Sequence, residues 1–222
     1  IVEVPLFTMN GDMTNDVQSL VGTFTSDTDF TISFGDLPSS PNWTEPQGST
    51  TRAIDDFEDS ADVTMFLRGV EIPTDPIGVL VETGATGDGM AMAFDVSNLV
   101  AAAGKGRATS TTNETVFVSM DKTLLANKTV DILLCIRPTA PGRIKVYVYN
   151  LDGSLIATTS DNIADGSVMG SQEPEGDWTG GNEMGVGLGD LIRDGVNSSN
   201  FNGIIPNGVE AYFEYLPQDF DS

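Results

Sequence analysis

Residues 77–106 read IGVLVETGATGDGMAMAFDVSNLVAAAGKG, and they begin the stretch of sequence that decides the fold. Residues 115–120 (TVFVSM) and 129–158 (TVDILLCIRPTAPGRIKVYVYNLDGSLIAT) continue that stretch. Short apolar runs alternate with turns rich in Gly, Asp and Pro, and no helical period of useful length lies between them. The pattern predicts consecutive antiparallel β-strands that are joined by tight turns.

The alternation of side chains in these strands predicts which faces are buried. In residues 90–94 (MAMAF), Met and Phe share one face, and residues 132–136 (ILLCI) are apolar on both faces. A strand that is apolar on both faces is expected in the middle of a packed sheet. In residues 143–149 (RIKVYVY), Ile and Val point one way, whereas Lys145 and the two tyrosines point the other way. Asp152-Gly153 then provides a tight hairpin turn.

Several of these segments together resemble a known family of domains. They are ETGATGDG (82–89) between two strands, VYVY (146–149) followed by LDGSLIA (151–157), and the closing runs FNGII (201–205) and VEAYFEY (209–215). Their order resembles the concanavalin A-like, or laminin G-like, jelly-roll domains over about residues 62–218. The resemblance implies an all-β, two-sheet antiparallel β-sandwich with long polar loops. We expect residues 1–222 to form one such domain. Lectins, glycan hydrolases and lyases, and purely structural modules share this fold, so the fold alone does not select a function.

Composition narrows the classes of partner. The 222 residues include 33 Asp and Glu but only 10 Lys and Arg, which gives a net charge of −23. Such a charge repels phosphates and anionic membranes, so nucleic acid and membrane insertion are not expected. It is compatible with divalent cations, neutral glycans, or simply a hydrated acidic surface. The one cysteine, Cys135, lies in the most apolar strand and is predicted to be a core residue.

Four Asn-x-Ser/Thr sequons fall in predicted loops or at strand borders, where a sugar could be carried. Their asparagines are candidate glycosylation sites: Asn42, Asn113, Asn127 and Asn197. The chain begins at Ile1 without a signal-peptide pattern, which is expected of a processed mature protein or of a truncated record. The sequons favour an extracellular location, or the surface of a cell or virion.

An acidic run in residues 53–62 (AIDDFEDSAD) is a candidate calcium site. Calcium prefers several oxygen ligands from a flexible loop, and five carboxylates in this run could supply them. The ordered spacing of an EF-hand loop is absent, and the alternative is a solvated acidic face. The candidate ligands are Asp55, Asp56, Glu58, Asp59 and Asp62.

Two tryptophans lie in predicted long polar loops, Trp43 in residues 38–51 and Trp178 in residues 160–181. An exposed indole could stack on a sugar ring, with Asn182 as a hydrogen-bonding partner. The alternative is that each Trp folds back and covers an open end of the sandwich. The paired acidic residues of the glucanases with this fold are not found at their usual spacing, and the chain contains no His. We therefore do not expect an enzyme.

The N-terminal residues 1–7 (IVEVPLF) alternate, with Val2, Val4 and Leu6 on one side, and residues 1–8 form a candidate edge strand. Pro5 removes one ladder hydrogen bond, which restricts this strand to the edge of a sheet. It could pair with the chain's own C-terminal strand in residues 209–216, or it could complete the sheet of a neighbouring copy.

The leading functional hypothesis is a non-enzymatic, secreted structural subunit. It would assemble with other copies of itself into a filament, fibre or surface layer. The alternative is a carbohydrate-binding, lectin-like module that binds glycans with calcium as a candidate cofactor.

Overall fold

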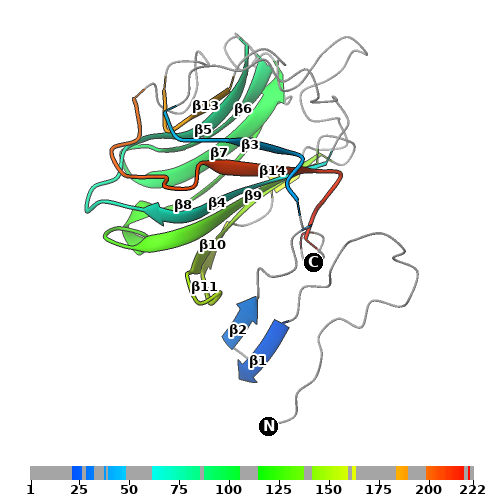
Figure 1. The fold of residues 1–222 in the computed structure, drawn as a ribbon, viewed down its shortest axis with the longest axis vertical. Coiled ribbons are helices and arrows are strands. Elements are labelled where there is room, and N and C mark those ends of the chain that lie inside the picture. Colours follow the sequence, from blue (N-terminus) through cyan, green and yellow to red (C-terminus); the bar gives the residue numbers. More distant parts are fainter. Residues whose placement is uncertain are drawn as a thin grey trace.

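The computed structural model describes residues 22–26, 29–32, 38, 40–48, 62–85, 88–105, 115–137, 142–159, 162–163, 184–189, 199–217 and 220. Nearly all of the regular structure in these residues is β-strand, arranged as two antiparallel sheets that pack face to face (Figure 1). The predicted fold class, an all-β antiparallel sandwich, is confirmed.

The larger sheet has the strand order β11-β10-β9-β4-β14-β3, and β12 also pairs with β10. Its two central strands, β4 and β9, each contain nine residues. The strands that compose it are β3 (Trp43–Glu45), β4 (Val63–Glu71), β9 (Thr129–Arg137), β10 (Arg143–Asn150), β11 (Leu155–Thr158), β12 (Asn162–Ile163) and β14 (Val209–Phe213).

The smaller sheet has the strand order β13-β5-β6-β7-β8. It is a meander from β5 to β8, and the late strand β13 is added beside β5. Its strands are β5 (Gly78–Ala85), β6 (Asp88–Phe94), β7 (Asn98–Lys105), β8 (Thr115–Asp121) and β13 (Met184–Val186). A separate hairpin of β1 (Gly22–Ser26) and β2 (Asp29–Ile32) lies below the sandwich in the view of Figure 1.

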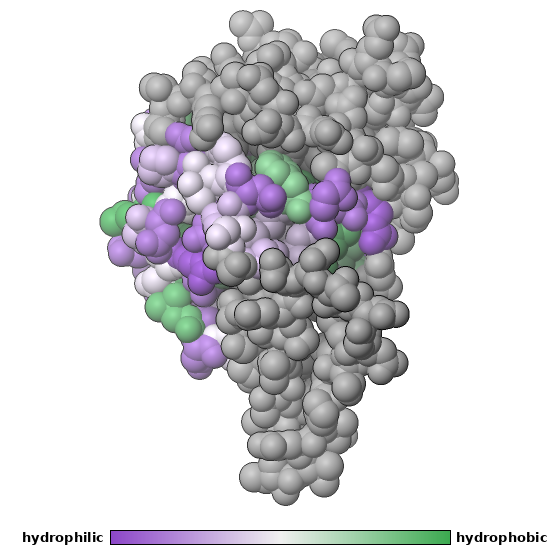
Figure 2. Space-filling view, turned by 45° about the vertical axis from the view of Figure 1, so that its right-hand side comes forward, coloured by the Kyte–Doolittle hydropathy of each residue, from purple (hydrophilic) through white to green (hydrophobic). Residues whose placement is uncertain are grey.

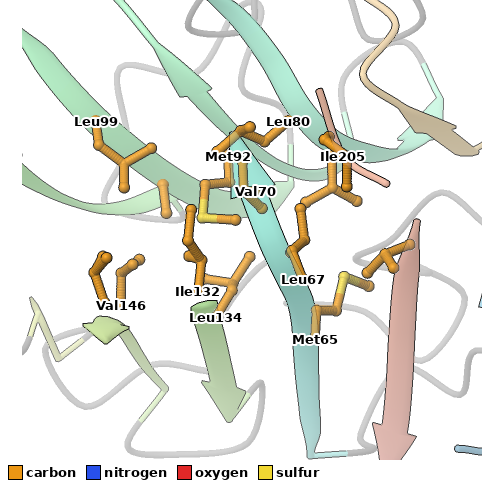
Figure 3. Close-up of a cluster of buried hydrophobic side chains, with 14 of the residues drawn as sticks. Met65, Leu67, Val70, Leu80, Met92, Leu99, Ile132, Leu134, Val146 and Ile205 are labelled. Atoms are coloured by element: carbon orange, nitrogen blue, oxygen red, sulfur yellow. The ribbon is translucent and has the colours of Figure 1, made fainter. Parts of the chain in front are cut away.

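The main core lies between the two sheets, where aliphatic and methionine side chains from both layers point toward one another (Figure 3). Met92 and Leu99 from the smaller sheet, and Ile132 and Val146 from the larger sheet, are each at most 1 % exposed. The inward alternation predicted for β6 and β10 is confirmed, because Met90, Met92 and Phe94 and the alternate Ile and Val residues of β10 all belong to this core.

The hairpin between β10 and β11 shows why the Asn-Leu-Asp-Gly sequence turns the chain. Gly153 has a φ of +84°, a conformation that Gly adopts without steric cost. The Asp152 carboxylate accepts hydrogen bonds from the backbone N and the hydroxyl of Ser154, and these bonds hold the pKa of Asp152 below its usual value. The predicted hairpin is confirmed.

The segment before β14 connects the two sheets. Asn200 bridges to Val79 of β5, and Ile204 bridges to Glu71 of β4. Between them, a Cβ added to Gly203 would lie 2.3 Å from the carbonyl oxygen of Glu71, so any larger residue would displace this crossing. The close approach of two backbones explains the glycine in this run.

Two segments predicted as uninterrupted loops contain short strands. Residues 38–51 include β3, and residues 160–181 include β12. Both strands are too short to show an apolar period in sequence, since β3 has three residues and β12 has two. They form because a longer neighbouring strand, β14 or β10, offers them main-chain partners.

Candidate functional site

The free edge of the smaller sheet at β8 is the candidate site of interaction. β8 pairs along its whole length with β7, from Asn98 opposite Asp121 to Gly104 opposite Thr115. No strand in the described part of the chain pairs with its other side. Val118 and Met120 are 4 % and 7 % exposed and point into the core, whereas Ser119 is exposed. An edge strand presents a row of main-chain N–H and C=O groups to the surroundings.

Among the described residues, β8 lacks several features that usually protect an edge, although β10 and β12 of the larger sheet lie close to it. With seven residues it is the longest edge strand among the described sheets, and TVFVSMD contains no Pro, no Lys and no bulge in its pairing with β7. Short strands, Pro, Lys and bulges are the common means by which proteins prevent edge-to-edge pairing. β3 and β13 have three residues each, and the ladder between β10 and the four-residue β11 is irregular at Val148 and Tyr149.

The opposite side of the sandwich is closed by cross-sheet hydrogen bonds. Gly48, just after β3, donates its backbone N–H to the carbonyl oxygen of Val186 in β13, at 3.1 Å. The side-chain oxygen of Gln47 accepts a hydrogen bond from the backbone N of Ile205. The bond between Gly48 and Val186 links the end of β3 to β13, so it hinders the addition of a strand on the β3–β13 side.

The C-terminal end of β8 is anchored by Lys122, the first residue of a short 3-10 helix, η2 (Lys122–Leu124). The Lys122 side chain is buried, and its Nζ donates to Asp75 Oδ1 at 2.6 Å, to the Pro76 carbonyl at 3.1 Å and to the Asp95 carbonyl at 3.3 Å. One ammonium group therefore connects the β4–β5 loop, the β6–β7 turn and the end of β8.

Asp121, the last residue of β8, caps η2. Its carboxylate accepts hydrogen bonds from the backbone N of Thr123 at 2.8 Å and from the Thr123 hydroxyl at 2.7 Å. These bonds hold the pKa of the exposed Asp121 carboxyl below its usual value. The cap defines where the strand ends and the helix begins.

A second cluster of buried side chains covers the outer face of the larger sheet, and we call it the outer aromatic cluster. It consists of Phe66, Leu133, Cys135, Tyr147, Tyr149, Tyr212, Tyr215 and Phe220. Cys135 is fully buried in this cluster, as predicted for a core residue. The tyrosines of β10 belong to it as well, so the predicted division of β10 into an aliphatic face and a tyrosine face is confirmed, and both faces are buried.

Basic side chains are concentrated on the same face. Four of the chain's ten Lys and Arg residues lie there, and each places its cation over an aromatic ring. Arg137 and Arg143 both lie over the ring of Phe220, at 5.4 Å and 5.1 Å from its centroid. Cation–π contacts of this kind are stabilising, more so when the cation is partly desolvated. The contacts from Arg137 and Arg143 hold the ring of Phe220 against the sheet.

Three polar side chains on this face, Tyr212, Glu210 and Arg68, contact one another. The Tyr212 hydroxyl donates to Glu210 Oε2 at 2.6 Å, and Arg68 Nε lies 3.4 Å from the same oxygen. Burial, together with the bond to the Glu210 carboxylate, raises the pKa of Tyr212 to about 12. Nearby, burial raises the pKa of Asp131, although its carboxylate accepts a 2.7 Å hydrogen bond from the backbone N of Gly69.

Trp43 lies in the main core, where it is 8 % exposed, so its indole does not offer an open ring face to a sugar. Its position agrees with the alternative reading of a Trp that covers one end of the sandwich. The other predicted sugar-binding residues, Trp178 and Asn182, lie outside the described residues.

Of the five predicted calcium ligands, only Asp62 lies within the described residues; Asp55, Asp56, Glu58 and Asp59 do not. Asp62 Oδ1 lies 4.0 Å from Nε of Arg137, which provides a local counter-charge. Across the described ranges, no three His, Cys, Asp or Glu side chains come together in a way that could bind a cation.

Two predicted sequons can be placed, and Asn113 and Asn197 lie outside the described residues. Asn127 is exposed, in a left-handed turn with a φ of +58°, and its side-chain oxygen accepts a 2.6 Å bond from the Thr74 hydroxyl. Asn42 is also exposed, and its side-chain oxygen accepts a bond from the backbone N of Phe213.

The predicted assembly residues Val2, Val4 and Leu6 lie outside the described residues. The structure does bear on where their strand could pair. β14 is flanked by β4 on one side and by β3 on the other, so residues 209–213 have no free edge for residues 1–7. The open edge at β8 was not identified from sequence, because TVFVSM predicts a strand but carries no signal of its place in a sheet.

Exposed large apolar side chains are scattered. Among the described residues they are Ile77, Val96, Leu124, Leu151, Leu155 and Ile204. In the coloured part of the face drawn in Figure 2, the green areas are separated by purple and white ones. In the described part of the chain, no helix is both long enough and apolar enough to span a membrane.

Comparison with known proteins finds weak structural likeness. No family model and no curated protein matches the chain. Thirteen solved chains match, among them the binding domain of botulinum neurotoxin serotype C1 (11% identity, TM-score 0.38), which covers 89% of this chain. Another is the binding domain of botulinum neurotoxin DC in complex with SialylT (10% identity, TM-score 0.35), which covers 90% of this chain. This chain spans 49% and 46% of those two chains. Likeness at this level is too weak to support an argument about function.

Proposed function

We propose that this chain is a non-enzymatic structural subunit that assembles with other copies of itself through the β8 edge of its smaller sheet. The observation that carries the proposal is the seven-residue edge at β8, whose outer side is paired with no strand that the structure describes. Strand addition at such an edge derives affinity from main-chain hydrogen bonds and specificity from the alternating side chains. The concanavalin A-like, jelly-roll resemblance of the sequence is compatible with this role.

The net charge of −23 sets a physical condition on this assembly. Copies with the same strong charge repel one another, and the repulsion is screened over about 10 Å at 0.1 M salt and about 3 Å at 1 M salt. Main-chain hydrogen bonds are short-range and are less sensitive to salt. Assembly is therefore expected to strengthen as the salt concentration rises.

We further propose that the assembly is extracellular or on a cell or virion surface. The exposed Asn127 and Asn42 sequons support this location, since both side chains can be reached from solvent in the folded chain. Glycosylation at either position would leave the main core intact, because neither asparagine belongs to it.

Sedimentation velocity and negative-stain electron microscopy test the proposal, over a range of protein concentrations at 0.1 M and 1 M salt. We expect filaments or regular arrays that become more abundant at 1 M salt. Ser119→Lys places a charge on the β8 edge and should weaken assembly. Ser97→Lys is a matched control, because it makes the same charge change at an exposed turn outside β8.

A chain that remains monomeric at 23.5 kDa under every condition would refute self-assembly. The carbohydrate-binding alternative would then be tested on a glycan panel with and without calcium. Equal loss of assembly in Ser119→Lys and Ser97→Lys would show that a general charge effect, not the β8 edge, is responsible.

A further inference from the structure

We infer that the strand received by β8 is the N-terminal segment 1–7 of a second copy of this chain. The inference rests on the proposed function and names the partner of the same edge. It requires a donor strand of suitable length and pattern, and it requires that the donor has no better partner within its own chain.

The acceptor has a defined length and two defined faces. β8 has seven residues, of which Val118 and Met120 continue the buried layer formed by the core-facing residues of β7. Ser119 faces outward and is exposed. A strand added to this edge would therefore need about seven residues, with apolar side chains at alternate positions on the core side.

The donor segment matches this requirement in length and alternation. Residues 1–7 (IVEVPLF) are seven in number, and Val2, Val4 and Leu6 fall on one face. In a β-strand, the main-chain groups of alternate residues also point to the same side. Lys122 N donates to the Ser97 carbonyl, so alternation along β8 directs the main-chain groups of Val118 and Met120 toward β7 and those of Ser119 toward the open edge. In a donor that runs parallel to β8, the residues that bond to Ser119 lie on the core face, so in that orientation Val2, Val4 and Leu6 can both bond to β8 and extend the core.

Pro5 then falls on the side of the donor that faces away from β8. Its missing N–H removes no bond from the shared ladder, since residues 1, 3, 5 and 7 direct their main-chain groups outward. A proline on the new outer edge also blocks the addition of another strand there. One donor would thus fill each acceptor and terminate the sheet.

The C-terminal strand, which is the most obvious partner within the chain, is not available. β14 is paired on both sides, with β3 and with β4. Because donor and acceptor are different surfaces, each copy can give one strand and receive one. Such a head-to-tail contact is heterologous and builds an open filament when its rotation does not close a ring.

The test uses the full chain with Val4→Asp, which places a charge on the face of the donor that would be buried. We expect this variant to raise the protein concentration at half-assembly by about 100-fold. Glu3→Ser is the matched control, because residue 3 lies on the opposite face. It should assemble at least as well as the unaltered chain. A synthetic peptide of sequence IVEVPLF, in excess, should also dissociate the assembly, and IVEDPLF should not.

Residue-resolved hydrogen exchange provides the readout at the acceptor. Every second amide of residues 115–121 points away from β7, and these amides should exchange at least about tenfold more slowly in the assembly than in dilute Val4→Asp monomer. The other amides of β8, which bond to β7, should change little.

The outcomes separate this inference from the proposed function. If Val4→Asp assembles like the unaltered chain, or if the outward β8 amides stay unprotected in the assembly, the donor assignment is wrong while self-assembly stands. If residues 1–7 instead pair with β8 of their own chain, the outward amides of β8 are protected at every protein concentration. Val4→Asp would then expose these amides without changing the sedimenting mass of the protein. That result also overturns the inference. If the unaltered chain never assembles, the proposed function itself fails.

Discussion

Replacing Lys122 with Met tests whether one buried ammonium group holds together the loops at the end of β8. Met keeps most of the apolar stem of the side chain but removes three hydrogen bonds, to Asp75 Oδ1 and to the carbonyls of Pro76 and Asp95. The aliphatic packing is therefore nearly conserved, and the measured change reports mainly on the polar contacts.

The expected magnitude follows from the exposure of each partner. The Asp75 side chain is 81% exposed, so its ion pair with Lys122 contributes at most about 1 kcal/mol. A hydrogen bond from a charged donor to a carbonyl contributes about 1.5–3 kcal/mol, and the 3.3 Å bond to Asp95 lies at the weak end. We expect Lys122→Met to lower the free energy of unfolding by about 2–4 kcal/mol in total.

Equilibrium unfolding in urea, followed by tryptophan fluorescence, measures this change. Asp75→Asn is the matched control, and we expect it to cost less than about 1 kcal/mol because the two carbonyl bonds remain. A Lys122→Met protein within about 0.5 kcal/mol of the unaltered chain would refute the reasoning. So would an Asp75→Asn protein that is destabilised as much as Lys122→Met.

Three further outcomes are expected. Phe220→Ala removes a fully buried ring from the outer aromatic cluster and should cost about 3–5 kcal/mol in the same urea assay, whereas Val96→Ala, at an 88% exposed position, should cost little. One of the four tyrosines, Tyr212, should ionise near pH 12 in an absorbance titration at high pH, and Tyr212→Phe should remove that late component. Because the folded-state pKa is above the unfolded value of about 10, the contribution of Tyr212 to stability is complete below pH 10 and is lost between about pH 10 and 12. If Asn127 carries a glycan in the secreted protein, Asn127→Gln should lower the mass by one glycan, and an unchanged mass would contradict modification at this site.

The strands with strong alternation were predicted well from sequence. In β6 and β10, each side chain has neighbours of the same character two residues away, so the buried faces can be assigned without knowing the partner strands. The burial of Trp43, by contrast, was not assigned from sequence. Its three-residue strand has no period of its own, and its burial depends on pairing with Ala211 in β14, more than 160 residues later in the chain.

The candidate site was harder still to predict from sequence, because its features depend on residues that are distant in the chain. Lys122 was not singled out from sequence, because its oxygen partners follow β4 and β6, which lie well before it in the chain. The TVFVSM run was recognised as a strand, but a strand's place in the middle or at the edge of a sheet is set by the strands that pair with it.

The sequence by itself determined that this is an acidic, all-β chain, and it determined which alternate residues of its longer strands are buried. These properties follow from local chemistry: side chains alternate every two residues along a strand, and turns require Gly, Asp or Pro at particular positions. Only the tertiary structure decided the strand order, and with it the edge position of β8 among the described strands, the two occupied edges of β14 and the position of the Lys122 ammonium group. The physical reason is that these features depend on hydrogen bonds between residues far apart in the chain, and no local pattern specifies such pairings.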